Sequence, residues 1–294
     1  MIPTLTLKTG NKIPKLGVGT WMIGGDKNRN PNNDDIGQIN SIKYAINSGI
    51  TWLRTAQNYA EGHCEEIVGK AIQGIPRENL YIMVAVNQKF IKKEDDFIRE
   101  AKVSLNRLGI EYVDLYMVGG LDETISLKTI ANGLKRVKNE GLAKDIGVGN
   151  YRLPELRQIH EYLGDDLVYN EVHANLLIRE PFENGVYQYC RDNNIVMGAY
   201  RPLQLGQLSK SGINILDALS TKYSKSQSEI ALKWLLSFQG VITMPKALKS
   251  EHIDQLSKIN DWTISKDDIT ELTKNFPLQV SVSDCTLPIS KYIK

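Results

Sequence analysis

A possible proton donor, Tyr59, and a permanent cation, Arg54, lie close together in the stretch from residue 51 to 62. This stretch predicts a short buried strand, then a turn, then a helix that begins near His63. A tyrosine hydroxyl has a pKa near 10 and donates its proton well near neutral pH only beside a cation. Arg54 could supply that charge, or it could anchor a carboxylate or oxyanion of a ligand. Its structural alternative is a buried salt bridge to Glu171.

Glu171, Lys246 and the pair His63-Cys64 also have more than one interpretation. Glu171 could abstract a proton or hold a structural hydrogen bond. Lys246 could form a Schiff base if it were desolvated. His63 and Cys64 suggest a thiol–imidazole pair, but sequence neighbours at a helix start seldom face each other, so Cys64 is expected in the core. His173 would share a face with Glu171 in a regular strand, and its direction stays open.

These residues depend for their positions on an alternation of short apolar runs and amphipathic stretches. In the amphipathic stretches, apolar residues recur every three or four positions, as on one face of a helix. Strand–helix alternation implies a parallel sheet covered by helices, and eight repeats imply an α/β fold closed into a (β/α)8 TIM barrel. The predicted strands span residues 16–20, 51–55, 81–86, 114–119, 145–149, 168–173, 195–200 and 241–245.

A hairpin is predicted before the first of these strands, over residues 4–13, with its turn at Gly10 and Asn11. Residues 250–259 and 265–276 are predicted to be an additional helix and the last barrel helix. The tail from Pro277 is predicted to be irregular. No linker or break in composition interrupts the chain, so we expect residues 1–294 to form a single domain.

The composition is that of an ordinary globular protein, with 41% hydrophobic and 24% charged residues. A net charge of +2 gives no reason to expect a nucleic-acid or membrane partner. No apolar run approaches the roughly 20 residues of a membrane span, and no signal pattern precedes the hairpin. The three cysteines, Cys64, Cys190 and Cys285, are far apart. This spacing argues against a disulfide framework or a metal site and favours a cytoplasmic location.

The stretch that contains Arg54 and Tyr59 resembles the Asp-Thr-Ala-x-x-Tyr-Gly signature of the aldo-keto reductases. Further segments similar to that family occur in the same order at residues 17–21, 114–116, 147–150, 170–171, 199–203 and 245–247. The resemblance covers nearly the whole chain and implies a barrel whose bottom is closed by the N-terminal hairpin. It also implies an NAD(P)H-dependent reductase with four catalytic groups: a Tyr proton donor, a Lys and an Asp that tune its pKa, and a His that orients the carbonyl.

Three of these four groups are replaced in this chain. Tyr59 matches the Tyr, but Arg54 stands in place of the Asp, Ala85 in place of the Lys and Gly119 in place of the His. Arg54 cannot act as a proton relay, because a guanidinium does not lose its proton in proteins. From these replacements we expect the reductase activity of the family to be lost.

The positions that the resemblance assigns to the cofactor are only partly kept. Asn150 and Tyr200 would hold and stack on the nicotinamide, Leu203 belongs to the same site, and Lys246 would meet the 2′-phosphate of NADP(H). The usual Ser, Gln, Arg and Asn are replaced by Gly149, Glu171, His252 and Leu256. Because His is a poor substitute for an Arg that binds phosphate at two points, no cofactor is expected, although the resemblance allows NADP(H).

The replacements also predict a wider pocket at the barrel mouth. Residues smaller than the usual ones stand at Ala85, Gly119, Gly120, Gly149 and Ala174. Trp52 should face inward with Arg54 and form an aromatic floor, near Trp21, while Gln57 and Asn87 add polar groups at the rim. A wide pocket of this kind suits a bulky, flat, apolar small molecule.

The first interpretation of the sequence is therefore an engineered aldo-keto reductase scaffold, with a rebuilt pocket for a small-molecule ligand and a new non-redox activity. Arg54, Tyr59 and Glu171 would be its functional residues. Two alternatives are an NAD(P)H-dependent oxidoreductase with a non-standard active site and a non-catalytic nucleotide-binding barrel.

Overall fold

The computed structural model describes residues 2–120 and 124–276, so the predicted tail and Cys285 lie outside the described residues. Its main sheet has eight strands, hydrogen-bonded in chain order through parallel pairings. They are β3 (Val18–Gly19), β4 (Trp52–Ala56), β5 (Tyr81–Asn87), β6 (Val113–Gly119), β7 (Ala143–Gly149), β8 (Leu167–His173), β9 (Val196–Tyr200) and β10 (Val241–Thr243).

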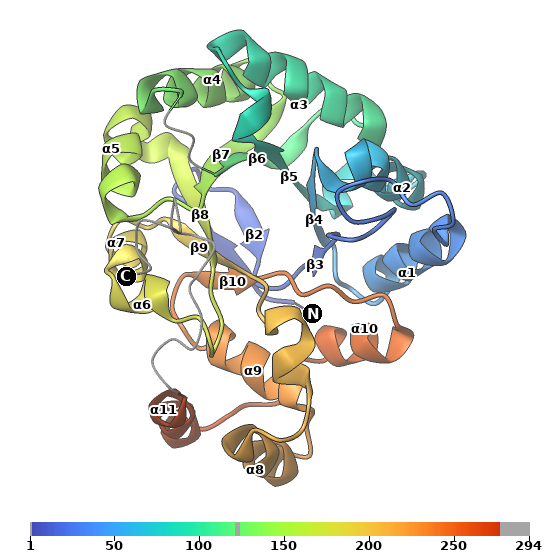
Figure 1. Cartoon of the computed structure of the whole chain (residues 1–294), viewed down its shortest axis with the longest axis vertical. Helices are drawn as coiled ribbons and strands as arrows, with labels where there is room; N and C mark the ends of the chain where they lie inside the picture. The colour runs from blue at the N-terminus through green and yellow to red at the C-terminus, as the bar shows by residue number, and fades with distance from the viewer. Residues whose placement is uncertain (1, 121–123, 277–294) are drawn as a thin grey trace.

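The first and last strands of this sheet meet and close the barrel. Leu16 forms a parallel bridge with Thr243. The Gly17 N–H donates to the Thr243 carbonyl at 3.0 Å, and the Thr243 N–H donates to the Lys15 carbonyl at 3.1 Å. The closed (β/α)8 barrel predicted from the strand–helix alternation is therefore confirmed (Figure 1).

The N-terminal hairpin lies where the sequence places it, with β1 (Thr4–Thr6) antiparallel to β2 (Lys12–Pro14). Leu7 and Ile13 belong to the cluster of apolar side chains inside the barrel. The hydroxyl of Thr9 and the amide of Asn11 both donate to the carboxylate of Asp145, near the start of β7. The hairpin therefore covers the end of the barrel at which the strands begin.

Helices surround the barrel, and Figure 1 shows them as an outer ring around the strands. They are α1 (Asp35–Asn47), α2 (His63–Ile72), α3 (Glu94–Leu108), α4 (Leu127–Asn139), α5 (Leu153–Leu163), α6 (Glu180–Glu183), α7 (Val186–Asp192), α8 (Asn214–Tyr223), α9 (Gln227–Leu236), α10 (Ser250–Ser257) and α11 (Lys266–Asn275). No helix among the described residues is long and apolar enough to span a membrane.

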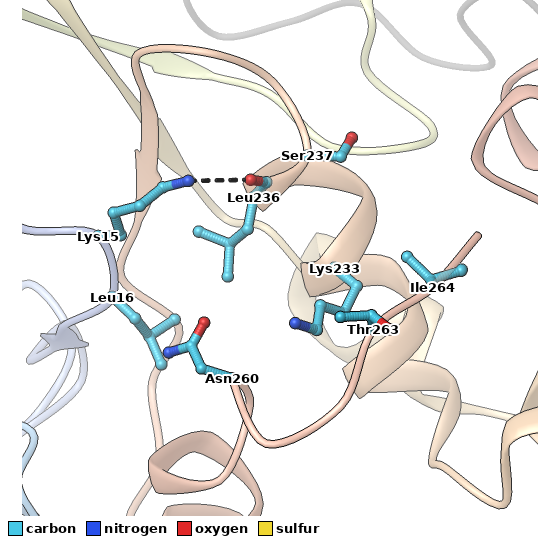
Figure 2. A pocket seen from close by; sticks show the side chains of 8 residues that line it. All are labelled: Lys15, Leu16, Lys233, Leu236, Ser237, Asn260, Thr263 and Ile264. Carbon is cyan, nitrogen blue, oxygen red and sulfur yellow. Dashed lines mark hydrogen bonds between the residues drawn. The ribbon is translucent and has the colours of Figure 1, made fainter. Parts of the chain in front are cut away.

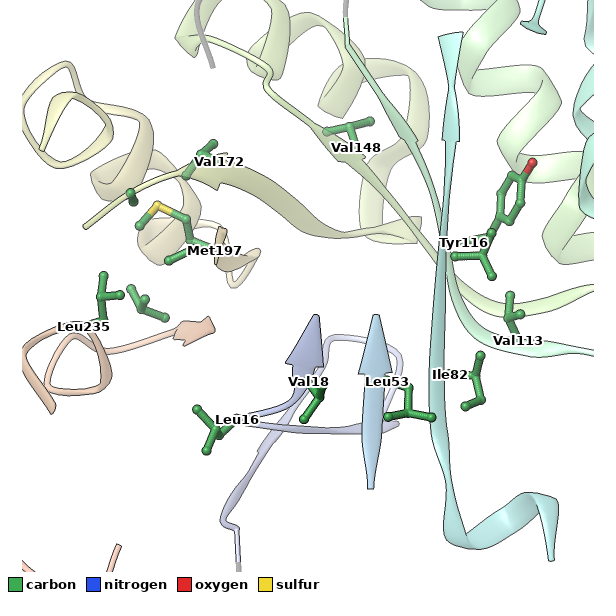
Figure 3. Close-up of a cluster of buried hydrophobic side chains, with 14 of the residues drawn as sticks. Leu16, Val18, Leu53, Ile82, Val113, Tyr116, Val148, Val172, Met197 and Leu235 are labelled. Carbon is green, nitrogen blue, oxygen red and sulfur yellow. The ribbon is translucent and has the colours of Figure 1, made fainter. Parts of the chain in front are cut away.

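Side chains alternate between the two faces of each strand. Leu53, Ile82 and Val148 point outward and pack with the helices in one large apolar cluster (Figure 3), and each fully buried aliphatic side chain contributes about 1.5–3 kcal/mol. Trp52 and Met83 belong to the second, interior cluster. The predicted inward direction of Trp52 and outward direction of Leu53 are therefore confirmed.

Three strands are shorter than predicted, β9 by only one residue because it begins at Val196. β3 covers only Val18–Gly19, because Leu16 pairs as an isolated bridge. β10 ends at Thr243, two residues before Pro245, which has no N–H to donate to a neighbouring strand. The helix predicted to reach residue 259 ends at Ser257.

Candidate active site

A paired arginine and glutamate lie at the end of the barrel where the strands finish. Arg54 comes from β4 and Glu171 from β8, and their side chains are 11% and 3% exposed. The Arg54 Nη2 lies 2.5 Å from Glu171 Oε1, and its Nε lies 3.2 Å from Oε2. The guanidinium thus binds the carboxylate at two points, as a planar fork does best.

Tyr59 completes this group. It begins the short turn of 3-10 helix η1 (Tyr59–Gly62), in which Ala60 and Glu61 have left-handed backbone angles with φ of 48° and 58°. Such backbone angles cost of order 1 kcal/mol or more for each non-glycine residue. The two strained residues lie in the turn between β4 and α2. The phenol oxygen of Tyr59 accepts a hydrogen bond from Arg54 Nη1, and the guanidinium carbon lies 5.4 Å from the centre of the Tyr59 ring.

Glu171 has a second partner in Tyr169, two residues earlier on the same inner face of β8. The Tyr169 hydroxyl donates to Glu171 Oε2 at 3.1 Å. Gly198 on the neighbouring strand leaves room for this hydroxyl, because a Cβ atom there would overlap it. The carboxylate is therefore held by Arg54 and Tyr169 together.

The charges of this group influence each other strongly because they are shielded from solvent. Burial disfavours the charged form of Arg54, yet the carboxylate of Glu171 keeps the pKa of the guanidinium above its ordinary value. Burial raises the pKa of the Tyr59 phenol, the charge of Arg54 opposes this rise, and the charge of Glu171 adds to it. Arg54 is thus a permanent cation, and Tyr59 is protonated at neutral pH.

The replaced catalytic positions lie around the same group. Ala85 is buried on the inner face of β5. Gly119 ends β6 and Gly120 follows it, and both are partly exposed. A Cβ atom at Gly119 would have its nearest neighbours at 3.9 Å, and one at Gly120 would meet nothing within 4 Å. The space expected at these two glycines is present.

The same space is absent at Gly149, where a Cβ atom would overlap the end of the Met117 side chain. Met117 points inward from β6 and belongs to the interior cluster. Ala174, at 0% exposure, also contributes no open surface. The widening expected from small residues is therefore partly cancelled by a neighbouring methionine.

Trp52 does not have an accessible face. It is 0% exposed, its ring lies against Gly17, and it packs edge-on to Tyr81 with ring centroids 6.3 Å apart. Trp52 and Tyr81 are the first residues of β4 and β5, two positions before the level of Arg54 in the sheet. Trp52 is therefore part of the barrel core and not the surface of an open pocket.

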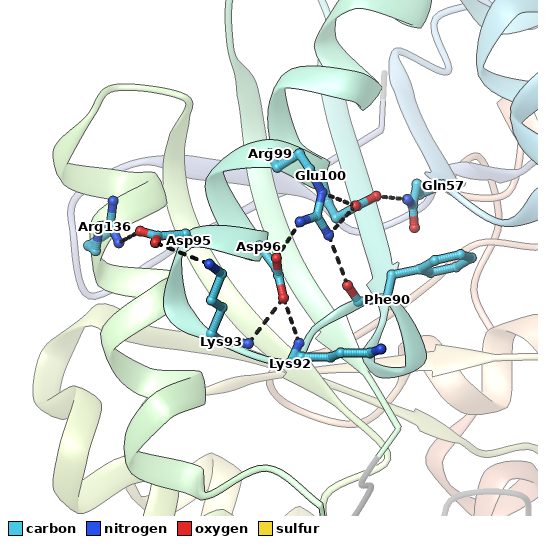
Figure 4. Close-up of polar contacts among 9 residues, drawn as sticks. All are labelled: Gln57, Phe90, Lys92, Lys93, Asp95, Asp96, Arg99, Glu100 and Arg136. Atoms are coloured by element: carbon cyan, nitrogen blue, oxygen red, sulfur yellow. Dashed lines mark hydrogen bonds and ion pairs between the residues drawn. The ribbon is translucent and has the colours of Figure 1, made fainter.

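Gln57 was expected at the rim and is instead turned outward beneath α3. It is 7% exposed and donates to the carboxylate of Glu100 (Figure 4). In the same network Arg99 contacts both Glu100 and Asp96, and Asp96 accepts from the backbone at the start of α3. This polar group fastens α3 to the barrel wall.

Two other predicted pocket residues are partly exposed. Trp21 lies under the guanidinium of Arg201, whose central carbon is 5.3 Å from the centre of the indole. Asn87 ends β5, and its side-chain oxygen accepts from the Lys89 N–H at 3.0 Å. Asn87 thus caps the short turn that follows the strand.

The positions assigned to the cofactor lie at the same end of the barrel. Asn150 follows β7 with a left-handed φ of 63°, and its buried side-chain oxygen has no partner among the described residues. Tyr200 ends β9, Leu203 follows it half-buried, and Lys246 is an exposed cation just beyond β10. The unpartnered oxygen of Asn150 suits the carboxamide of NADP(H), the Tyr200 ring suits its nicotinamide, and the Lys246 cation suits a phosphate. These residues therefore fit that cofactor.

The sequence left the direction of His173 open, and the structure places it beside Tyr200. β8 stays regular to its end, so His173 shares the inner face with Glu171. Its ring stacks on that of Tyr200 at 5.2 Å between centroids, and Nε2 lies 2.8 Å from the side-chain oxygen of Gln204. His173 thus joins the site, and only its period-two spacing from Glu171 could have indicated this.

The thiol–imidazole interpretation is excluded by the directions of the two side chains. Cys64 is buried in the core against Thr20 and Thr55, and burial raises the pKa of its thiol to about 11. His63 lies instead between the carboxylates of Asp35 and Glu66, at 2.8 and 2.7 Å. Among the described residues, no group of three or more His, Cys, Asp or Glu is arranged to hold a metal ion.

A closed parallel barrel with polar side chains gathered where its strands end has the architecture of the (β/α)8 enzymes. The sequence profile of the aldo/keto reductase family matches residues 15–275. The chain therefore belongs to the aldo/keto reductase family.

Comparison with individual proteins agrees with this assignment. Methylglyoxal reductase YeaE of Escherichia coli (strain K12) is 25% identical to this chain, over 90% of this chain and 92% of its own length. The crystal structure of the thermostable aldo-keto reductase Tm1743 in complex with the inhibitor epalrestat has a TM-score of 0.88 and 30% identity, covering 93% of this chain and all of that one.

An aldo-keto reductase from Klebsiella pneumoniae, solved in complex with NADPH, has the same fold with a TM-score of 0.84. It is 23% identical and covers 96% of this chain and 97% of its own.

Proposed function

We propose that this protein is an NADP(H)-dependent oxidoreductase that acts on a small carbonyl compound, with Tyr59 as the proton donor and Arg54 as the cation that assists it. The observation that carries the proposal is the position of the Arg54 guanidinium, which bridges the phenol of Tyr59 and the carboxylate of Glu171. The resemblance to the family implies the order phenol, cation and carboxylate, with Lys and Asp as the last two. Here Arg54 on β4 takes the place of the cation, and Glu171 on β8 takes the place of the carboxylate.

The direction of the hydrogen bonds suits proton donation by Tyr59. Arg54 has only protons to give, so the Tyr59 oxygen accepts from it, and the phenol's own proton stays available for a carbonyl oxygen. Once that proton has left, the guanidinium charge stabilises the phenolate. Because Arg54 keeps its own protons, the phenolate has to recover a proton from water. Gly119 and Gly120, at the end of β6, crowd nothing in the structure and would leave room there for water and substrate.

The cofactor would supply the hydride that completes the reduction. Asn150 would accept from its carboxamide, Tyr200 would stack on its ring, and Lys246 would bind its outer phosphate. The relatives support this part of the proposal, since one is named as a methylglyoxal reductase and another is solved in complex with NADPH. Glu171 is not counted as a cofactor ligand, because both its oxygens are engaged by Arg54 and Tyr169.

A fluorescence titration of NADPH with the protein, followed by assays of NADPH oxidation with methylglyoxal, tests the proposal. We expect tight binding and turnover. Tyr59→Phe should keep NADPH binding and lower kcat by a factor of about 10²–10⁴, the usual contribution of a general acid. Turnover that is unchanged in Tyr59→Phe would refute the role of Tyr59.

The replacements at Ala85 and Gly119 favour a second candidate, a barrel that binds the nucleotide without turning it over. Tight NADPH binding with no oxidation of the cofactor would support it. Absence of NADPH binding would favour the remaining interpretation, a mouth widened at Gly119 and Gly120 for a bulkier ligand and a non-redox activity.

A further inference from the structure

A small cavity lies at the opposite end of the barrel from Arg54 and Tyr59, where the strands begin (Figure 2). Its volume is about 190 Å³. Three segments line it: the residues before β3, the end of α9, and the loop after α10. The lining residues are Lys15, Leu16, Lys233, Leu236, Ser237, Asn260, Thr263 and Ile264.

Two half-buried ammonium groups, those of Lys15 and Lys233, line this one cavity. The Lys15 Nζ donates to the Leu236 carbonyl at 3.0 Å, which uses one of its three protons. The Lys233 Nζ lies 5.2 Å from the centre of the Trp262 ring. Among the described residues, no carboxylate forms an ion pair with either lysine. Asp261 attracts the charge of Lys233 only from a greater distance.

Gathering two like charges in a partly dry cavity is unfavourable unless something offsets it. Burial lowers the pKa of Lys15. Burial also lowers the pKa of Lys233, and the charge of Lys15 lowers it further. An anion between the two ammonium groups would remove this repulsion and supply the missing partner.

We propose that this cavity binds a small tetrahedral oxyanion of the phosphate class, either inorganic phosphate or a small phosphate monoester. Besides the two ammonium groups, the exposed side chains of Asn260 and Thr263 at the mouth of the cavity offer an amide and a hydroxyl donor that bond to nothing else among the described residues. Ser237 is not counted, because its hydroxyl donates to the Trp234 carbonyl at 2.6 Å. Together these groups offer more N–H and O–H donors than the two oxygens of a carboxylate accept. The four oxygens of a phosphate match them better.

The site joins parts of the chain that are distant in sequence. Lys15 belongs to the connection between the hairpin and the barrel, Lys233 to α9, and Asn260 to the loop after α10. A bound anion would hold these three segments together at the base of the barrel. This inference does not rest on the proposed reductase activity, because none of its residues lies near Tyr59.

Isothermal titration calorimetry and thermal shift with inorganic phosphate, at constant ionic strength and pH 7, test the inference. All proteins carry Lys246→Met, so that phosphate cannot bind at the expected cofactor position. We expect saturable binding at one site and a rise in melting temperature with phosphate concentration. Lys15→Met and Lys233→Met should each weaken the affinity by about tenfold or more, the effect of losing one charge-assisted hydrogen bond.

Matched controls separate this site from general charge effects. Lys128→Met removes an exposed lysine on α4 and should leave the affinity unchanged. Acetate should bind more weakly than phosphate, and titration with glycerol 2-phosphate shows whether a monoester is preferred. Lys233→Gln replaces the Met variant if that protein fails to fold. Equal phosphate affinity in the parent, Lys15→Met and Lys233→Met proteins, or no binding at all, would overturn the inference.

Discussion

Arg54 and Glu171 form a two-point ion pair across the interior of the barrel, from β4 to β8, which are not neighbours in the sheet. Each strand pairs only with the strands beside it, so this contact links two parts of the wall that the backbone hydrogen bonds do not join directly. Removing either partner would leave a buried charge without compensation.

The first prediction concerns this pair. Arg54→Ala should lower the free energy of unfolding by about 3–5 kcal/mol, because it strands the carboxylate of Glu171. Arg54→Lys should lower the free energy of unfolding by less, because lysine keeps the positive charge but cannot bind the carboxylate at two points. Urea denaturation measures both. Lys128→Ala, which removes an exposed lysine from α4, is the control and should change stability by no more than about 0.5 kcal/mol.

The same variants separate structure from function. If Arg54 assists Tyr59, Arg54→Ala should also abolish NADPH-dependent reduction at a temperature where the variant is fully folded. Unchanged turnover together with a clear loss of stability would leave Arg54 as part of the scaffold only.

A second prediction restores the residues usual in the family. The triple variant Arg54→Asp, Ala85→Lys and Gly119→His should reduce aldehydes with a kcat/KM at least about tenfold above that of the parent. A side chain can begin at Gly119 without a clash, because a Cβ atom there would meet nothing closer than 3.9 Å. Arg54→Asp alone should be inactive, because it places two carboxylates together and removes the cation. An active single variant would contradict the role given to Arg54.

A third prediction follows from Asp268, in the first turn of α11. Hydrogen bonds from Lys222, Tyr223 and Ser265 lower the pKa of its carboxyl to about 2. A carboxyl whose pKa is lower in the folded state stabilises the fold above its unfolded value near 3.9, and this stability is lost as the pH falls to about 2. Solvent screening reduces the effect to about 1 kcal/mol.

The comparison with Asp268→Asn measures this effect. The variant should be less stable than the parent in urea at pH 6, and the difference should shrink between pH 4 and pH 2. Asp267→Asn, which alters the exposed neighbour, should show no such convergence. A difference that stays constant down to pH 2 would contradict the prediction.

Most of the fold could be predicted because its signals are local. The period of two in the strands placed Trp52 and Arg54 inside the barrel and Leu53 outside. The cost of an isolated buried charge pointed to Glu171 as the partner of Arg54. The ends of β3 and β10 differ from the prediction, because they depend on where the last strand meets the first.

The finer parts of the site depend on contacts between segments far apart in the chain. The bond from Arg54 to Tyr59 lies at the turn that follows β4, whose left-handed residues Ala60 and Glu61 are themselves neither glycine nor asparagine. The space at Gly149 is filled by Met117, a residue on the neighbouring strand whose direction the sequence analysis did not consider. Gln57 turned away from the mouth because Glu100 on α3 offered it a partner.

The last prediction concerns Gly198. Its lack of a side chain leaves room for Tyr169, and Tyr169 in turn donates to Glu171 of the ion pair. The backbone angles of Gly198 are not left-handed, so an alanine there costs nothing in local conformation, but its Cβ would overlap the Tyr169 hydroxyl. Tyr169 would have to move, and its hydrogen bond to Glu171 would be lost. Gly198→Ala should therefore lower the free energy of unfolding by about 1–3 kcal/mol through overpacking.

Gly119→Ala is the matched control, a strand glycine with space around it, and should be nearly neutral in stability. The loss of stability from Gly198→Ala should be smaller in a Tyr169→Leu background, because this change removes the hydroxyl, Cζ and Cε2 atoms that the added Cβ would overlap. Equal losses of stability in the two glycine variants would show that the packing of Tyr169 against Gly198 does not hold Glu171 in place.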